Sequence, residues 1–444
     1  MSNQVQSNMR RVAYTALAGT SIEWYDFFLY GAAAALIFPT VFFGEASPST
    51  ALILSFLTFA AGFIARPIGG IIFGHFGDRI GRKKTLVIAL ILMGVSSTLI
   101  GLLPTYAMIG VTAPILLTTL RFAQGIAIGG QWGGAMLLVT ESAPSNQRGY
   151  YGAFAQAGAP AGVILANLAF IITSALVSDE SFLAWGWRIP FLASALLIAI
   201  SMYIQLNLED TKAFKELQSY KENHLKDNNL NETSFKKSPI IEAIKKYPKR
   251  IILAAGAFLS IQVTFYILIA FMLVYGVSDT NLSRADILTA ILIASAIQIP
   301  VQFVFASYSD RHGRKGIFML GAVLTALWAF AIFPLVDTGS FWLTVLAITG
   351  GLVFLAMMYG PQAAFFTELF TTEVRYSGAT LGYQFGAIAG GAFAPSIAAF
   401  LWTEYDIVWV SAYIAFASLL TLLSVMTLTE TFQTDLNETT SQEI

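Results

Sequence analysis

Cysteine is absent from the 444-residue sequence. The chain can therefore form no disulfide, and it offers neither a thiol nucleophile nor a cysteine ligand for a metal. Histidine is nearly absent as well, with three residues, so we expect no metal centre. Charged residues make up only 11% of the chain, and a formal net charge of -1 with a pI near 6.3 leaves no basic surface for nucleic acid.

Hydrophobic residues, by contrast, make up 56% of the sequence, and the mean hydropathy is +0.68. This composition is typical of integral membrane proteins. Apolar runs of roughly 20 residues, the length at which a helix spans a bilayer, recur along the chain. They begin near Val12, Thr50, Thr85, Thr112, Tyr150, Trp187, Ile251, Arg284, Gly316, Phe341, Tyr376 and Tyr405. We therefore predict an all-α integral membrane protein with twelve transmembrane helices, the first of them too long to be a cleaved signal peptide.

A polar segment divides these runs into two sets of six. We predict an N-terminal six-helix bundle over residues 1–206, a cytoplasmic linker over 207–250, a C-terminal six-helix bundle over 251–429 and a cytoplasmic tail over 430–444. The linker has little apolar periodicity, except at its start, where a short helix could form. We interpret it as a tether that lets the two bundles move.

Basic residues lie on one side of the predicted membrane. Of the 25 Lys and Arg residues, all but Arg66, Arg121, Arg188 and Arg284 fall on the same side. Cytoplasmic loops of membrane proteins are enriched in Lys and Arg. The pattern therefore predicts that both termini and the linker are cytoplasmic.

A charged turn occurs once in each half. It reads GHFGDRIGRKK over residues 74–84 and SDRHGRK over residues 309–315. A second repeat places a glutamate seven residues before an arginine in the predicted fourth and tenth helices, Glu141 before Arg148 and Glu368 before Arg375. These positions are equivalent in a six-plus-six duplication.

These repeated charges predict a cytoplasmic gate. An aspartate can lie at the positive end of a neighbouring helix, and arginines can pair with the glutamates, so the contacts could hold one conformation and break in another. The alternative is charge that only sets topology, which requires neither glycine at fixed offsets nor aspartate in a basic cluster. The predicted gate residues are Asp78, Arg79, Arg82, Glu141, Arg148, Asp310, Arg311, Arg314, Glu368 and Arg375.

The turn at residues 74–84 resembles the signature of the major facilitator superfamily, a GxxxDRxGRK-type turn between the second and third helices. Further strings are similar to one branch, the metabolite:proton symporter family, and most of all to its shikimate-transporting members. They are EWYDFFLYG, ARPIGG, RFAQG, WGWRIPFL, APILL and GYQFGAIAGG, and the resemblance covers essentially the whole chain.

The resemblance implies two bundles that rock around a site near the bilayer midplane. It further implies a functional monomer in the bacterial cytoplasmic (inner) membrane that takes up a small polar organic acid with a proton. Members that carry proline or betaine and members that carry 2-oxoglutarate remain alternatives. The osmolyte members tend to have a long C-terminal coiled coil that is not seen after the last predicted helix here.

Two carboxylates lie inside the first predicted helix. Glu23 and Asp26 are three residues apart and therefore share a face. Ionisable groups in a membrane are costly and usually functional, so we predict that Asp26, and secondarily Glu23, carries the proton. Alternatively, they pair with an arginine and hold helices together.

A polar stripe in the predicted fourth helix contains Arg121, Gln124 and Gln131. Arg121 could bind an anionic substrate or form a structural pair with Asp26, whereas Arg66 precedes a proline and is a weaker candidate. In the second half, mid-helix polar groups are neutral. The predicted substrate-binding residues are Arg121, Gln124, Gln131, Tyr30, Gln262, Tyr266, Gln298, Tyr359, Gln362 and Tyr383.

Gln131 differs from the family pattern. The resemblance implies Gly-Gly-Glu and an aromatic residue, whereas this chain has Gly-Gly-Gln-Trp over residues 129–132. An uncoupled uniporter is therefore an alternative to proton symport. A channel would not need a duplicated gate, and an enzyme would need a nucleophile, metal cluster or cofactor loop that the sequence does not show. We expect no cofactor.

Overall fold

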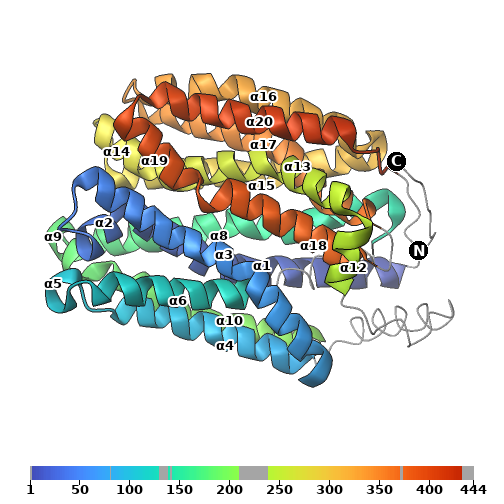
Figure 1. Ribbon diagram of the computed structural model, residues 1–444, viewed down its shortest axis with the longest axis horizontal. Coiled ribbons are helices and arrows are strands. Elements are labelled where there is room, and N and C mark those ends of the chain that lie inside the picture. The colour runs from blue at the N-terminus through green and yellow to red at the C-terminus, as the bar shows by residue number, and fades with distance from the viewer. Residues whose placement is uncertain are drawn as a thin grey trace.

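The computed structural model describes residues 3–80, 82–129, 139–140, 143–209, 239–370 and 374–432. In these residues the secondary structure is entirely helical, and the helices assemble into twelve long rods that run along one direction (Figure 1). The rods match the twelve apolar runs of the sequence. The predicted all-α fold class is confirmed.

The first six rods precede the gap at residues 210–238. They are α1 (Asn3–Leu36), α3 (Pro48–Ile80), α4 (Arg82–Leu102), α6 (Thr112–Gly129), α8 (Arg148–Leu176) and α10 (Arg188–Glu209). Short helices join them at one end: α2 (Phe38–Phe42), α5 (Tyr106–Ile109) and α9 (Asp179–Ser181), the last followed by a π-helical turn, η2 (Phe182–Gly186). A single 3-10 turn, η1 (Ser145–Gln147), precedes α8.

The last six rods begin after α12 (Pro239–Lys246). They are α13 (Pro248–Tyr266) continued by η4 (Ile267–Phe271) and α14 (Met272–Asp279), then α15 (Arg284–His312), α16 (Arg314–Val336), α17 (Phe341–Glu368), α18 (Arg375–Gly386) continued by η5 (Ala387–Ala392) and α19 (Ala394–Glu404), and α20 (Ile407–Thr427). The expected linker thus contains a helix, α12, near its end that the sequence did not predict.

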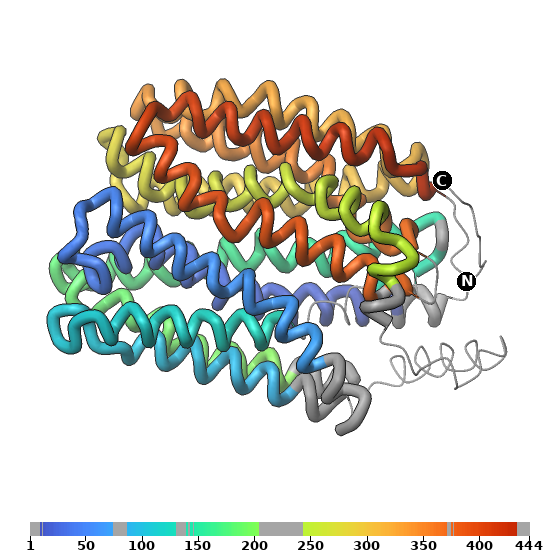
Figure 2. The backbone as a smooth tube through the Cα atoms, in the orientation of Figure 1, coloured from blue at the N-terminus to red at the C-terminus, as the bar shows by residue number. Residues whose placement is uncertain are grey.

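We call the end of the molecule where α1 begins and α20 ends the terminal end, and the end with α2, α5 and α9 the far end (Figure 2). Two rods of the second group, the seventh and the eleventh, are interrupted by the π-helical segments η4 and η5. Such segments often occur at functional sites. Tyr266 precedes η4 directly, and Gly391 of η5 lies against Tyr266 and Phe63 of α3. The interruptions therefore lie where the two groups of helices meet.

Glycines allow α3 and α6 to approach closely. A Cβ atom added at Gly125 would meet the backbone carbonyl of Gly62, and one added at Gly129 would meet that of Arg66. No larger residue fits at these crossings, and the spacing of four residues keeps both glycines on one face of α6. This contact places Arg66 of α3 beside the polar stripe of α6.

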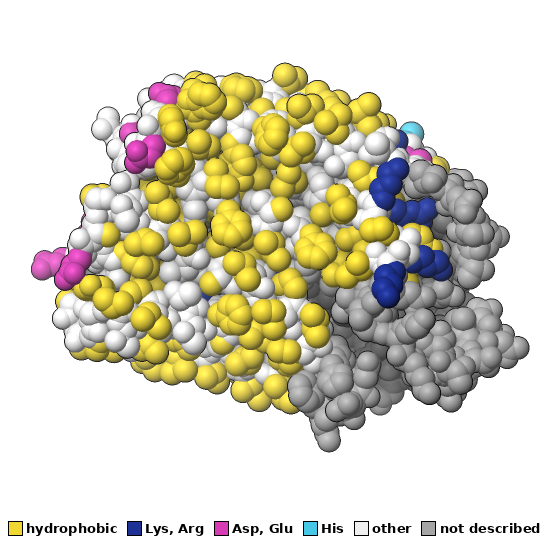
Figure 3. Space-filling model, in the orientation of Figure 1, with side chains coloured by type: hydrophobic (Ala, Val, Ile, Leu, Met, Phe, Trp, Pro, Cys, Tyr) yellow, Lys and Arg dark blue, Asp and Glu magenta, His cyan; other side chains and the backbone are white. Residues whose placement is uncertain are grey.

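The outer surface is suited to a bilayer. By length and composition, eight helical spans of the described chain can cross a membrane, and the bent pair of 179–186 and 188–203 can form a ninth. Apolar side chains cover the sides of the rods in Figure 3, whereas Lys and Arg side chains gather toward the terminal end. Exposed side chains such as Leu176 and Leu327, which are costly in water, are favourable against lipid.

Candidate substrate site and gate

Arg121 of α6 lies fully buried against α1 and α3, the first and second rods. Its guanidinium Cζ lies 4.1 Å from the centroid of the Phe27 ring, 4.3 Å from that of Tyr30 and 4.7 Å from that of Phe59. Gly62 makes room for it, because a Cβ there would lie 2.6 Å from Arg121 Nε. Aromatic faces stabilise a buried cation but provide no hydrogen-bond acceptor.

A chain of polar side chains leads from Arg121 into the first group of helices. Arg121 Nη1 donates to Gln124 Oε1 at 2.6 Å, and Gln124 Nε2 donates to Ser97 Oγ of α4 at 2.7 Å. The hydroxyls of Ser97 and of Ser194 on α10 face the carboxylate of Asp26. The polar groups of α1, α4, α6 and α10 therefore lie close together, with hydrogen bonds from Arg121 as far as Ser97.

Asp26 is 1% exposed, and neither of its oxygens has a hydrogen-bond partner of normal geometry among the described residues. The alternative of a structural Asp26–Arg121 ion pair is therefore not what the structure shows. Glu23 is half-buried and forms interactions of its own. Asp26 is consequently the more strongly desolvated acid of the two.

Arg66 of α3 is a second buried cation near Arg121. It is 1% exposed, and its Cζ lies 4.3 Å from the Phe27 centroid and 4.4 Å from the Phe63 centroid. It contacts the Tyr266 hydroxyl across the boundary between the two halves. The sequence reading gave Arg66 little weight, although a charged residue inside a membrane helix is itself the signal that could have found it.

Three tyrosines of the second half lie near this arginine. Tyr266, Tyr359 and Tyr383 all lie within electrostatic range of Arg66 and are nearly fully buried. The Tyr266 ring also packs at 5.1 Å against Phe63. The structure thus brings these three predicted residues together with Arg121 and Gln124.

The other predicted residues have different surroundings. Tyr30 donates to Thr58 Oγ1 at 2.6 Å, so its hydroxyl positions the ring beneath Arg121. Gln362 accepts from Gln156 of α8, a cross-half contact that the sequence reading did not include. Gln262 Nε2 and both amide atoms of Gln298 are buried without a hydrogen-bond partner among the described residues. Gln131 lies outside the described residues.

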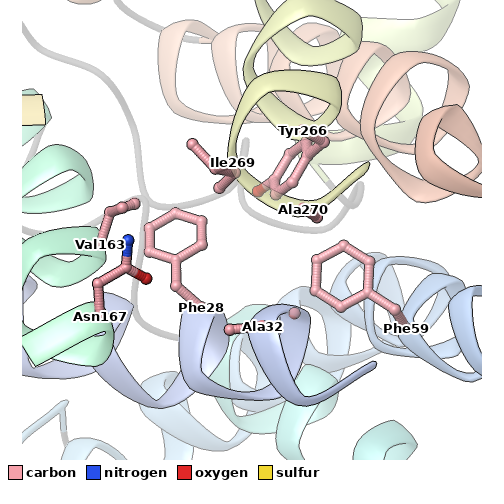
Figure 4. Close-up of a pocket in the computed structure, with 9 residues that line it drawn as sticks. Phe28, Ala32, Phe59, Val163, Asn167, Tyr266, Ile269 and Ala270 are labelled. Atoms are coloured by element: carbon pink, nitrogen blue, oxygen red, sulfur yellow. The ribbon is translucent and has the colours of Figure 1, made fainter. Parts of the chain in front are cut away.

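A small cavity of about 10 Å³ lies beside this centre, close to the space that one water molecule needs (Figure 4). Phe28 and Ala32 of α1, Phe59 of α3 and Tyr266 enclose it, and Asn167 approaches from α8. Its lining comes from both halves.

A charge cluster joins the halves at the terminal end. Asp310 of α15 accepts from the backbone N–H groups of Gly149 and Tyr150, at 2.8 Å each, at the N-terminus of α8. Arg314 donates to Asp310 at 2.6 Å and holds Glu368 with Nε and Nη2 at 3.2 and 3.1 Å. Arg148 lies 3.7 Å from Glu368. A helix N-terminus and an arginine of the first half therefore bind two acids of the second.

The remaining gate candidates differ in their placement. Arg375 donates to the backbone carbonyls of Thr367 and Phe370, at 3.1 and 3.3 Å, and Arg311 is exposed. The side chains of Asp78, Arg79 and Arg82, and all of Glu141, lie outside the described part of the chain.

A segment after α20 completes the cluster, and the sequence reading missed it. Glu430 accepts from the backbone N–H groups of Arg314 and Lys315 at 3.0 and 2.9 Å, so it caps the N-terminus of α16. Thr431 donates to Glu368 Oε2 at 2.8 Å.

A further contact between the halves lies toward the far end, where Asn167 of α8 donates to the Leu288 carbonyl of α15 at 3.2 Å. The halves therefore touch at both ends.

Comparison with known proteins identifies the class. The sequence matches the family described as Major Facilitator Superfamily over residues 17–381 and 278–442. The chain belongs to the major facilitator superfamily, and it is a membrane transporter, not an enzyme. The resemblance found in the sequence is thereby confirmed.

Particular relatives narrow the description. The chain is 38% identical to the inner membrane metabolite transport protein YhjE of Escherichia coli strain K12, over 96% of this chain and 95% of that protein. It is 39% identical to the shikimate transporter of the same strain, over 92% and 91%. It is thus similar to bacterial inner-membrane metabolite transporters.

The fold is shared with a solved proton:xylose symporter, XylE, bound to 6-bromo-6-deoxy-D-glucose. The TM-score is 0.69 at 16% identity, with 98% of each chain covered. The likeness confirms the twelve-helix fold.

Proposed function

We propose that this protein takes up a small organic carboxylate together with a proton by alternating access, with both termini in the cytoplasm. The observation that carries the proposal is the polar chain from Arg121 through Gln124 and Ser97 to Asp26. It connects a buried cation, suited to an anionic substrate, to a buried acid that has no ion-pair partner among the described residues.

The chain of contacts supplies a way to couple the two ligands. An ionised carboxylate in an apolar interior is costly unless a nearby positive charge compensates it. Arg121 lies within electrostatic range of Asp26 without pairing with it, so it supplies part of that charge while its site is free of substrate. A bound substrate carboxylate neutralises Arg121, so Asp26 then becomes neutral by taking a proton. Substrate and proton therefore bind together.

The experiment is uptake into energised membrane vesicles, measured against pH and with a protonophore, using a panel of shikimate, quinate, proline, betaine, citrate and 2-oxoglutarate. Wild type should accumulate a carboxylate only with a proton gradient. Asp26→Asn should retain downhill exchange and lose accumulation. Arg121→Lys should weaken binding without abolishing it, because an ammonium keeps the charge but cannot reproduce the two parallel hydrogen bonds of a guanidinium.

Gln131 favours the competing function of an uncoupled uniporter, since an amide replaces the acid of the family pattern. If wild type never accumulates substrate but Gln131→Glu does, the coupling acid belongs at position 131 and Asp26 is not the proton site. Accumulation of proline or betaine, with none of the net-anionic acids of the panel transported, would instead establish an osmolyte symporter.

A further inference from the structure

The two buried arginines of the central site share one unexplained feature. In Arg66 and in Arg121, the nitrogens without a hydrogen-bond partner among the described residues are Nε and Nη2. These two nitrogens form one edge of the guanidinium, and their N–H bonds are parallel. This edge matches the two oxygens of a carboxylate.

Arg314 shows what this edge does elsewhere in the same molecule. It uses Nε and Nη2 to hold the two oxygens of Glu368 at 3.2 and 3.1 Å, in the gate. Arg188 of α10 shows the opposite case, because its Nη1 donates to the carbonyls of Gly101 and Leu103 at 2.9 and 2.6 Å and thereby ties helices together. In the described residues, Arg66 and Arg121 use this edge neither for an ion pair, as Arg314 does, nor for another hydrogen bond.

Both edges belong to one site. Each Cζ lies over the ring of Phe27, at 4.3 Å for Arg66 and 4.1 Å for Arg121, so the guanidiniums are separated by no more than the sum of these distances. Both side chains also lie along α3, Arg121 against Gly62 and Arg66 one helical turn further. A single carboxylate has only two oxygens and can fill one edge, which leaves the other buried donors unpaired at a cost in affinity.

We propose that Arg66 is a second anion-binding residue and that the site takes a dicarboxylate, with one carboxylate on each arginine edge. The inference rests on the proposed function and specifies its substrate class. Two carboxylates neutralise two buried cations and supply four acceptor oxygens for four donors. Arg66 also contacts Tyr266, so the second carboxylate is bound where the two halves meet.

The test compares succinate and glutarate with their monomethyl esters, which keep the chain length and remove one negative charge. Binding to the purified full chain is measured by calorimetry. Wild type should bind a diacid at least about tenfold more tightly than its half ester, the value of a lost charge-assisted contact. This comparison needs no variant.

Three variants assign the effect to residues. Arg66→Lys and Arg121→Lys keep the positive charge but lose the two parallel N–H donors of Nε and Nη2. Each variant should therefore abolish the preference for the diacid. Arg188→Lys is the matched control, because it alters a half-buried arginine that donates only to the backbone carbonyls of Gly101 and Leu103 in the described chain, and it should keep the preference. Equal binding of diacid and half ester by wild type, or full preference in Arg66→Lys, would overturn the proposal.

The outcomes also separate this inference from the proposed function. If half esters and other monocarboxylates are accumulated with a proton while diacids gain nothing, the carboxylate symport stands and the second binding edge is wrong. If the diacids, their half esters and every carboxylate of the uptake panel fail to bind, both fail.

Discussion

Asp310→Asn should open the terminal end of the protein. Its carboxylate accepts two backbone N–H groups of α8 at 2.8 Å and one from Arg314 at 2.6 Å, so it joins the halves with charge-assisted bonds at a helix N-terminus. An asparagine retains one acceptor oxygen but turns an N–H group toward these donors. The loss is about 1–3 kcal/mol. That shifts a two-state equilibrium roughly five- to a hundredfold toward the state without the contact.

The assay measures distances between spin labels attached to introduced cysteines. Because the natural sequence has no cysteine, the introduced thiols are the only labelling sites. One pair, Tyr203→Cys with Tyr308→Cys, reports on the terminal end, and another, Met108→Cys with Trp342→Cys, reports on the far end; all four positions are exposed. Asp310→Asn should lengthen the distances of the first pair and lower the uptake rate. Glu404→Gln, which changes an exposed acid outside the gate, is the control. Distance distributions and uptake equal to wild type in Asp310→Asn would refute the gate.

Three further outcomes follow from local geometry. Glu430→Gln should lower the melting temperature, because the cap of α16 loses its charge, at about 1 kcal/mol, whereas Thr431→Ser should keep its bond to Glu368 and change little. Gly62→Ala should weaken substrate binding about tenfold, because its Cβ would lie 2.6 Å from Arg121 Nε, whereas Gly70→Ala meets nothing nearer than 3.4 Å and should bind normally. The hydrogen bond from Tyr106 to Glu45 raises the pKa of Tyr106, so Glu45→Gln should lower that pKa toward its usual range in a spectroscopic titration referenced to Tyr106→Phe. The stability from this pair is complete below the ordinary tyrosine pKa and is lost as the pH rises through the raised one.

The sequence alone determined the fold class and the positions of the charged turns. A bilayer requires every backbone polar group to be satisfied within its own helix, so apolar runs of sufficient length predict spanning helices directly. Asp310, Arg314 and Glu368 correspond to Asp78, Arg82 and Glu141 of the first half. The equal spacing of the neighbouring charges in the two halves reveals this repeat in the sequence. The apolar runs also place Asp26 and Arg121 inside spanning helices. Charged residues are rare there and usually indicate function.

Tertiary structure decided which of these groups meet. Arg66 and Arg121 are separated by 55 sequence positions in different helices, and only the close glycine contacts of α3 and α6 place both guanidiniums over Phe27. Asp26 could have paired with Arg121 by the sequence, but the rotation of α1 directs it toward Ser97 and Ser194 instead. Glu430 follows the last helix without any periodic pattern, and it caps α16 only because α20 ends beside that helix. Such contacts join segments distant in the chain, and no local pattern of residues specifies their distances.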